Sequence, residues 1–276
     1  MFVCKNFFVL APLLFSGEAT RLNEIARAIA AFAMFCLLAS AIYLWNDVVD
    51  AAADRAHPTK RERPIAAGRI GARPATLAGA VLAALALVTA WFIEPQLGLI
   101  ALAYLGLNVL YTFSLKQMVL LDVFAIAAFF ILRLLAGATA IGVRPSIWLL
   151  LCGGLLALYL GFTKRRQELS TLGSGSVDHR SVLSHYSPAF LDQMSGVLLA
   201  VTVVSYILYT VSSETARNAG DDLLTYSTVF VLYGVFRYLY LVHQRDGGSP
   251  TMTLLTDRAL MVNVILWVIY CAWVIY

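Results

Sequence analysis

Nine long apolar stretches constrain this chain more than any other feature of its sequence. Most of them approach the length of about 20 residues that a helix needs to cross a lipid bilayer. They cover residues 4–16, 25–45, 74–93, 96–113, 118–141, 146–163, 192–211, 223–243 and 259–276. We therefore expect an all-α polytopic membrane protein, in which a bundle of nine transmembrane helices forms a single domain over residues 1–276.

Composition excludes the other broad classes of protein. Hydrophobic residues make up 61% of the chain and charged residues 13%, whereas a soluble domain has about 45–50% and about 25%. So few charges could not cover a soluble fold of this size, and so apolar a chain is not intrinsically disordered. The four cysteines lie in apolar stretches without the spacing of a metal site or a C-x-x-C motif. We interpret them as small apolar residues.

The first apolar stretch is short and allows two interpretations. It begins almost at Met1 and contains Lys5 and Asn6, and the run Phe7–Phe15 has the length of the apolar part of a signal peptide. No clear A-x-A cleavage site follows this run. A first helix that is retained in the protein is therefore the favoured interpretation.

Lysine and arginine are unevenly distributed over the connecting loops. Thirteen of them fall in the loops on one side of the predicted membrane, and three in the loops on the other side. This bias places the N-terminus and the two long loops, residues 46–74 and 162–191, in the cytoplasm. We expect a multi-pass protein of a bacterial-type inner membrane, with a cavity that opens to the cytoplasm beneath these two loops.

Three aspartates and an asparagine follow one another at the end of the second stretch. Asn46, Asp47, Asp50 and Asp54 are spaced so that one helix face carries them all. Like charges on one stripe repel, and a divalent cation among them removes the repulsion. Carboxylate and amide oxygens suit Mg²⁺, which shares its coordination with waters and phosphates. The alternative is an ordinary solvated helix end, although such an end on this side of a membrane normally carries lysine or arginine.

A basic stretch follows the acids within a few residues. Lys60, Arg61 and Arg63 lie between Pro58 and Pro64, which stiffen the path by fixing φ. Acidic residues that hold a metal, beside cations that hold phosphate oxygens, are typical of a metal–polyphosphate site. The alternative for these cations is a simple anchor on anionic lipid.

These motifs resemble a known family. Asn46-Asp47-x-x-Asp50-x-x-x-Asp54 is similar to the N-D-x-x-D-x-x-x-D motif of the UbiA superfamily of intramembrane prenyltransferases. Residues 57–68, H-P-T-K-R-E-R-P-I-A-A-G, resemble more specifically the branch of decaprenyl-phosphate phosphoribosyltransferases, which make a cell-wall precursor. Further matches extend the resemblance over most of the chain. They are Lys5-Asn6 with Pro12, Tyr111-x-x-Ser114-x-Lys116, and Leu121-Asp122. The resemblance implies that Lys5, Tyr111, Lys116 and Asp122 are candidates for contacts with a lipid phosphate or the cavity.

The second long loop begins with basic residues where aromatic-prenylating members of the superfamily carry a second acidic motif. This chain has Lys164, Arg165 and Arg166 there, followed by Glu168. A basic cluster contacts phosphates directly, without a metal. We therefore predict that Lys164 and Arg165 bind the phosphates of a sugar donor, and that Glu168 orients a cation or contacts the ribose hydroxyls. Positive-inside anchoring is the alternative.

Two arginines lie inside predicted spans, Arg133 and Arg237. An arginine within the membrane is costly and usually faces a polar cavity or a partner. Asp122 precedes Arg133 by eleven residues, about 16 Å along a helix axis, so the two are not expected to pair directly. A structural role and a lipid-phosphate role remain equally open for Arg133, and the same alternatives hold for Arg237.

The resulting functional hypothesis is a Mg²⁺-dependent membrane glycosyltransferase. It would transfer 5-phosphoribose from phosphoribosyl diphosphate to a polyprenyl phosphate of the decaprenyl type and release diphosphate. The alternative is a UbiA-type aromatic prenyltransferase, which the basic second loop disfavours. A third class, a transporter or lipid-binding scaffold, would need more charges near the bilayer midplane. We expect no nucleic-acid partner, and a homo-oligomer is left open.

Overall fold

The computed structural model describes residues 3–56, 60–172, 181–212, 222–244 and 256–275, and these residues form helices and connecting turns without a strand. Residues 57–59 and 173–180 of the two long loops lie outside the described residues. The all-α prediction is thereby confirmed for the part of the chain that the structure describes.

Among the described residues, seven helices are long and apolar enough to cross a membrane, and each coincides with one of the predicted spans. They are α2 (Leu22–Val49), α4 (Ala72–Ile93), α5 (Pro95–Phe113), α6 (Leu121–Ala140), α7 (Ile147–Leu172), α9 (Pro188–Val211) and α13 (Arg258–Ile275). The eighth predicted span forms the short helix η6 (Asp222–Ser227) and the 17-residue α11 (Thr228–Gln244). The first forms the 3₁₀ helix η1 (Val3–Leu10) and α1 (Ala11–Phe15). The expected nine spans are therefore helical, but only seven reach the spanning length among the described residues.

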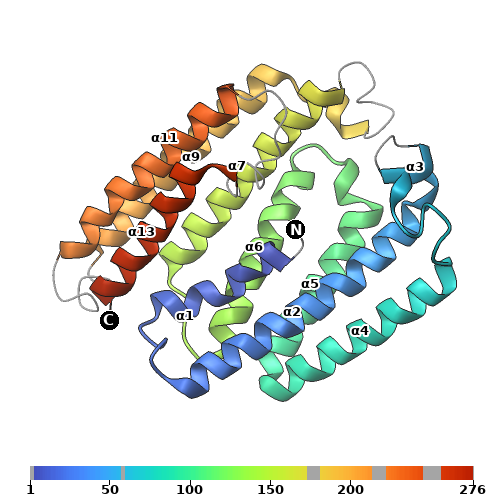
Figure 1. Ribbon diagram of the computed structural model, residues 1–276, viewed down its shortest axis with the longest axis horizontal. Helices are drawn as coiled ribbons and strands as arrows, with labels where there is room; N and C mark the ends of the chain where they lie inside the picture. Colours follow the sequence, from blue (N-terminus) through green and yellow to red (C-terminus); the bar gives the residue numbers. More distant parts are fainter. Residues whose placement is uncertain (1–2, 57–59, 173–180, 213–221, 245–255, 276) are drawn as a thin grey trace. The chain divides into compact units, whose positions relative to one another are not determined.

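Two compact units make up the chain (Figure 1). Unit 1 comprises residues 1–116 and 132–145, and unit 2 comprises residues 117–131 and 146–276. The helix α6 contributes its first half to unit 2 and its second half to unit 1.

Small residues pack the helices of unit 1 closely together. In α4 the buried positions recur every three or four residues, and all of them are alanine or glycine, namely Ala75, Gly79, Ala83, Ala86 and Ala90. This stripe lies against α2, as expected for membrane helices whose backbones approach each other through small side chains. A second close approach occurs at Gly137 of α6, where a Cβ atom would collide with the carbonyl oxygen of Val9 in η1. The packing of η1 against α6 therefore requires a glycine at position 137, far from η1 in the sequence.

Two apolar clusters form the core of unit 2. One gathers Val123, Phe162, Val182, Tyr186 and Leu191, and the other Tyr159, Leu199, Tyr238, Leu241 and Leu260. The first cluster brings α6, α7, the short helix η5 (Ser181–His185) and α9 together. It therefore fixes the start of α6, which carries Asp122, and the polar end of α7, which carries Lys164, Arg165, Arg166 and Glu168.

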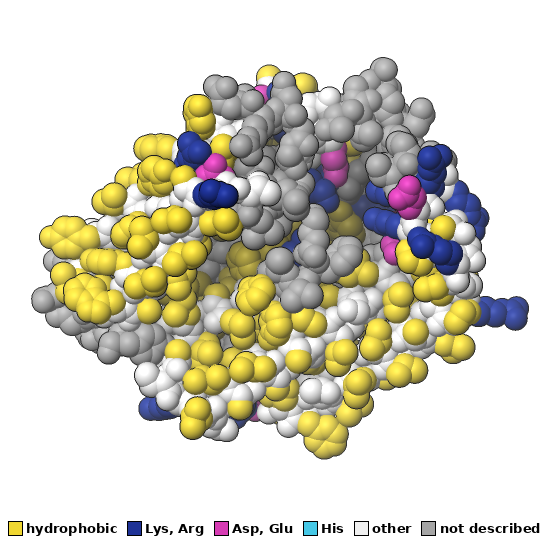
Figure 2. Space-filling view, viewed as in Figure 1, with side chains coloured by type: hydrophobic (Ala, Val, Ile, Leu, Met, Phe, Trp, Pro, Cys, Tyr) yellow, Lys and Arg dark blue, Asp and Glu magenta, His cyan; other side chains and the backbone are white. Residues whose placement is uncertain are grey.

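Hydrophobic side chains are spread widely over the described part of the face drawn in Figure 2. Many large ones are strongly exposed, among them Phe92 at 87% and Phe236 at 63%. Charged side chains gather where Figure 1 draws the short helix α3 (Ala51–Ala56) of unit 1. An apolar exterior of this extent is expected where lipid is the solvent.

Candidate active site

The acidic motif lies where α2 ends and α3 begins. Asp50 caps α2 with φ −87° and ψ 1° and separates the two helices. The backbone N–H of Asp50 still donates to the carbonyl oxygen of Asn46, and that of Asp54 to the carbonyl oxygen of Asp50, each at 2.8 Å. The backbone hydrogen bonds therefore continue across the break between α2 and α3, and the four predicted residues stay at one end of unit 1.

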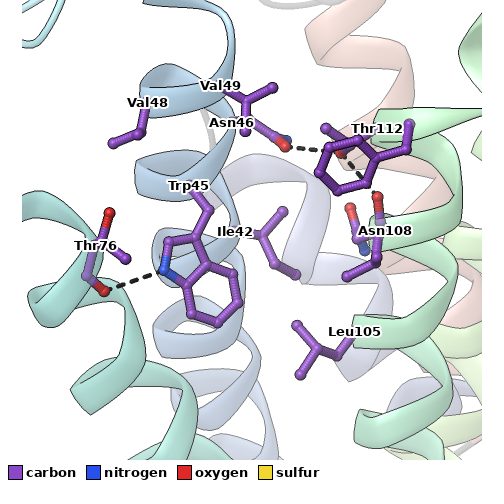
Figure 3. A pocket seen from close by; sticks show the side chains of 11 residues that line it. Ile42, Trp45, Asn46, Val48, Val49, Thr76, Leu105, Asn108 and Thr112 are labelled. Carbon is purple, nitrogen blue, oxygen red and sulfur yellow. Dashed lines mark hydrogen bonds between the residues drawn. The ribbon is translucent and has the colours of Figure 1, made fainter. Parts of the chain in front are cut away.

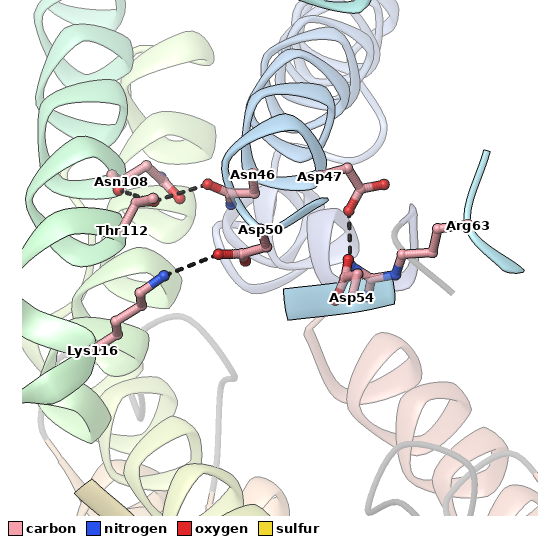
Figure 4. A network of polar contacts seen from close by, with 8 residues as sticks. All are labelled: Asn46, Asp47, Asp50, Asp54, Arg63, Asn108, Thr112 and Lys116. Atoms are coloured by element: carbon pink, nitrogen blue, oxygen red, sulfur yellow. Dashed lines mark hydrogen bonds and ion pairs between the residues drawn. The ribbon is translucent and has the colours of Figure 1, made fainter. Parts of the chain in front are cut away.

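The two edges of this acidic face have different partners (Figure 4). On one edge, Nη1 of Arg63 donates to Oδ1 of Asp47 at 2.8 Å and to Oδ2 of Asp54 at 2.9 Å. On the other edge, Lys116 of the short helix η3 (Leu115–Gln117) places its Nζ 3.2 Å from Oδ1 of Asp50. Each of the three carboxylates thus has a cation beside it.

The turn after α3 brings Arg63 to this position. Arg55 donates from Nε to the carbonyl oxygen of Ala66 at 3.1 Å, and Ile65 and Ala66 are buried. Gly68 has φ +74°, a left-handed conformation that favours glycine, and closes the turn. The predicted phosphate ligands Lys60 and Arg61 lie exposed in the 3₁₀ helix η2 (Lys60–Glu62), directly before Arg63.

The amide of Asn46 points to α5. The hydroxyl of Thr112 lies 2.8 Å from Oδ1 of Asn46 and 2.8 Å from the carbonyl oxygen of Asn108 (Figure 4). Sequence reasoning missed Thr112 and Asn108. Their signal was spacing, because Thr112 stands one helical turn before the predicted residue Lys116.

The oxygen atoms of the acidic motif suit Mg²⁺ if waters and substrate phosphates supply the remaining ligands. Among the described residues, no group of three or more acidic, histidine or cysteine side chains converges closely enough to hold a metal ion. Mg²⁺, however, is usually bound through one or two carboxylates, with waters and substrate phosphates completing its octahedron. Asp47 and Asp50 are the accessible carboxylates, with side chains 28% and 41% exposed, whereas Asp54 is 5% exposed. Asp54 is therefore better placed to hold Arg63 than to bind an ion shared with a substrate.

In unit 2, the predicted basic residue Arg165 is completely buried. Its Nε donates to Oδ2 of Asp122 at 2.6 Å, and its Nη1 donates to Oε2 of Glu168 at 2.7 Å. Neither Arg165 nor Asp122 has an exposed side chain. We therefore revise the expected role of Arg165 in direct phosphate contact, because its charge is matched by two carboxylates inside the protein. Glu168 contacts Arg165 and Lys164, and both roles predicted for it, orienting a cation and contacting the ribose hydroxyls, stay predictions.

Lys164 remains at the surface of the same helix end. Its side chain is 53% exposed, and its Nζ lies 3.9 Å from Oε1 of Glu168. Arg166 pairs with Asp192 of α9 at 3.0 Å, a partner that sequence reasoning did not identify. Of the three consecutive cations, Lys164 is thus the most exposed one.

Tyr186 completes the surroundings of Asp122 and was also missed. Its hydroxyl donates to Oδ1 of Asp122 at 2.8 Å and accepts the backbone N–H of Leu120 at 2.7 Å. Burial, assisted by the carboxylate of Asp122, raises the pKa of Tyr186 to about 12. The hydroxyl therefore stays protonated at neutral pH and donates to Asp122 throughout.

The remaining candidates lie within unit 1. Arg133 is buried and donates from Nε to Oδ1 of Asn6 at 2.9 Å and from Nη2 to the hydroxyl of Tyr104 at 2.5 Å. Its guanidinium also lies over the Tyr104 ring, 5.0 Å from the centroid. These contacts join η1, α5 and α6. Lys5 and Tyr111 are half-buried.

Arg237 has a partner in unit 2. Its Nη2 lies 2.9 Å from Oδ2 of Asp257, whose Oδ1 accepts the backbone N–H of Leu260 in the first turn of α13. Arg237 thus ties α11 to the capped start of α13, which is a structural contact.

Comparison with known proteins shows the family to which the chain belongs. Residues 7–264 match the UbiA prenyltransferase family. The chain belongs to the UbiA prenyltransferase family. Among curated UbiA relatives, the decaprenyl-phosphate phosphoribosyltransferase of Mycolicibacterium smegmatis is 32% identical over 96% of this chain and 86% of its own length. The proteins of the same name from Corynebacterium glutamicum and Mycobacterium tuberculosis are 32% and 31% identical, over 99% and 96% of this chain and 83% and 88% of their own lengths.

Solved structures show the same fold. A UbiA homolog from Archaeoglobus fulgidus, bound to DMAPP and Mg²⁺, superposes with a TM-score of 0.71 and 19% identity, over 99% of this chain and 96% of that one. A UbiA homolog from Aeropyrum pernix in its apo form has a TM-score of 0.63 and 15% identity, over 96% and 98%. The UbiA-like fold expected from the motifs is therefore confirmed.

Proposed function

We propose that this UbiA-family protein transfers 5-phosphoribose from phosphoribosyl diphosphate to a polyprenyl phosphate of the decaprenyl type. The observation that carries the proposal is nearly full-length similarity, at 31–32% identity, to three proteins named decaprenyl-phosphate phosphoribosyltransferase. The acidic face flanked by Arg63 and Lys116 supports it, because a diphosphate leaving group needs positive charge around it. We further propose that the site faces the cytoplasm of a bacterial inner membrane, following the loop-charge bias.

The reaction needs little acid–base assistance. A phosphate monoester loses its second proton with a pKa of about 6, so the lipid phosphate is already a nucleophile at neutral pH. Its oxygen forms a bond to C1 of the ribose while the bond from C1 to the diphosphate oxygen breaks, and the diphosphate leaves with the electron pair. The protein has to hold two anionic substrates together and stabilise the charge that develops on the leaving group.

Specific residues of unit 1 suit these tasks. Asp47 and Asp50 would hold Mg²⁺ through their exposed oxygens, with Asn46 beside them, and the ion would supply positive charge to the diphosphate. Asp54 holds Arg63 at the edge of the acidic face, and the exposed Lys60 and Arg61 provide further cations for phosphate oxygens.

In unit 2, we propose that Lys164 contacts a substrate phosphate, while Arg165 and Glu168 position it. The ion pairs from Arg165 to Glu168 and from Glu168 to Lys164 support this division of roles. The aromatic prenyltransferase alternative is disfavoured by these residues, since a second Mg²⁺ would need acids at the position of the cations.

The direct test uses washed membranes that contain the protein. Incubation with labelled phosphoribosyl diphosphate and decaprenyl phosphate should yield a labelled lipid product that is abolished by EDTA. Membranes with the Asp50→Asn variant serve as the matched control. A labelled product formed instead from a prenyl diphosphate and an aromatic acceptor, with phosphoribosyl diphosphate left unconsumed, would overturn the proposal in favour of the alternative.

A further inference from the structure

A groove of about 320 Å³ lies within unit 1, bounded by α2, α4 and α5 (Figure 3). Its walls are mainly apolar. They come from one face of each of two helices, Ile42, Trp45 and Val49 on α2 and Leu105, Val109 and Phe113 on α5. The volume is at the small end of ligand pockets, which hold about 300–1,000 Å³. From Leu105 to Thr112, its α5 wall rises about 10 Å along the helix axis.

One wall of the groove has a polar patch that includes Asn46 of the acidic motif. Asn46, Asn108 and Thr112 line it there, and the Thr112 hydroxyl joins the other two through contacts of 2.8 Å. Asn46 directly precedes Asp47 in the chain, and Lys116 follows Thr112 by four residues, in η3 just after the end of α5. The groove therefore adjoins, along both helices, the charged residues that we propose bind substrate phosphates.

The indole of Trp45 closes the groove on the side of α4. Its Nε1 donates to the carbonyl oxygen of Thr76 at 3.2 Å (Figure 3). A Cβ atom at Gly79 would lie 2.5 Å from this Nε1. The ring thus fits into a gap that only glycine leaves in α4, and it forms a fixed wall.

We propose that this groove binds the part of a polyprenyl phosphate chain that is nearest to its phosphate. The identity of the lipid rests on the proposed function, whereas the groove itself does not. The chemistry of the junction selects the occupant. In a polyprenyl phosphate the apolar chain is bonded directly to the phosphate oxygen, so a phosphate beside Lys116 and a chain along Val109 can belong to one molecule. In a phospholipid, a polar glycerol ester would have to lie between them, against the apolar Phe113 and Val49.

A photoreactive probe tests the groove without relying on turnover. The probe is a polyprenyl phosphate with a diazirine on the isoprene unit next to the phosphate, incubated with the full-length protein in membranes. We expect labelling of the α5 peptide that contains Val109, and competition by unlabelled decaprenyl phosphate. Displacement by an equal excess of phosphatidylglycerol would show an ordinary lipid groove and overturn the proposal.

Neighbouring residues of α5 provide matched variants. Val109 and Leu110 are 47% and 58% exposed, but only Val109 lines the groove. Val109→Trp should fill the groove, abolish the labelling and raise the acceptor KM about tenfold, the loss expected for a few methylene contacts. Leu110→Trp should change neither quantity, and the donor KM should stay constant in both variants.

The outcomes separate this inference from the proposed function. If Val109→Trp does not accumulate as a folded protein, Val109→Phe should show an intermediate loss of labelling. If Val109→Trp abolishes labelling but the unsubstituted protein shows no phosphoribosyl transfer, the groove binds the lipid chain as proposed and the proposed reaction is wrong. Labelling that persists unchanged in both Val109 variants would sink the groove, whatever the activity.

Discussion

Arg165 and Asp122 stand 43 positions apart in the chain and form an ion pair of 2.6 Å in which neither side chain is exposed. The carboxylate of Asp122 also accepts a hydrogen bond from the hydroxyl of Tyr186. Residues of α6, α7 and the segment before α9 therefore all contact this buried carboxylate. Breaking such a pair leaves an uncompensated charge inside the protein. The contact therefore carries a first prediction about stability.

Arg165→Met should destabilise the folded protein by about 3–5 kcal/mol, because Asp122 loses its buried counter-charge. Thermal unfolding of the purified protein in detergent measures the effect. Lys164→Gln is the matched control on the adjacent exposed position and should leave the melting temperature nearly unchanged. Equal melting temperatures for Arg165→Met and the unsubstituted protein would contradict a structural role for Arg165.

Lys164→Gln should instead act on the sugar donor. Losing one charge-assisted hydrogen bond costs about 1.5–3 kcal/mol, which is a rise of about ten- to hundredfold in the donor KM. Arg166→Gln removes the same charge from the next exposed cation, which pairs with Asp192, and should leave the donor KM unchanged. If neither variant changed the donor KM, the two cations would act only as membrane anchors.

Asp50→Asn should lower the rate of Mg²⁺-dependent turnover by at least about a hundredfold, because a metal ion supplies several kcal/mol of charge stabilisation. Its melting temperature should remain close to the original, since the side chain is 41% exposed. Activity measured over a titration of MgCl₂ checks this result. Glu62→Gln, an exposed acid in the same loop, is the control that should keep full activity, and an unaffected Asp50→Asn would remove the metal assignment.

Gly79→Ala should destabilise unit 1 by about 1–3 kcal/mol through overpacking, since the new Cβ would meet the indole of Trp45 at 2.5 Å. Combining it with Trp45→Ala should remove most of this penalty, because the colliding ring is gone. Unfolding measurements on the two single variants and the double variant give the coupling free energy. Additive effects would show that the two side chains do not meet.

Sequence reasoning reached the helices because their length and apolar composition are local properties. It could not find the break at Asp50, since Ala51 and the alanines after it all favour a continuous helix. It predicted one acidic face but not which cations pair with its carboxylates, because Arg63 and Lys116 approach opposite edges from different parts of the chain.

The role of Arg165 shows a second limit. A run of three cations carries no sign of which one is buried, and the partner that decides it, Asp122, belongs to another helix. Tyr186 and Thr112 were missed for the same reason, as each acts through a contact more than sixty positions away. The structural role of Arg237 likewise depends on its ion pair with Asp257, which the sequence does not reveal.

The contact between Asn6 and Arg133 spans 127 positions, and it bears on how the protein is made. Ribosomes add about 5–20 residues per second, so on the order of ten seconds separate the synthesis of Asn6 from that of Arg133. During that interval, the glycine that admits the backbone of Val9 has not been synthesised either. The segment around Asn6 is therefore among the last parts of unit 1 to reach its final place, although it is synthesised long before Arg133. A chain stalled before residue 133 would lack the residues against which this segment packs.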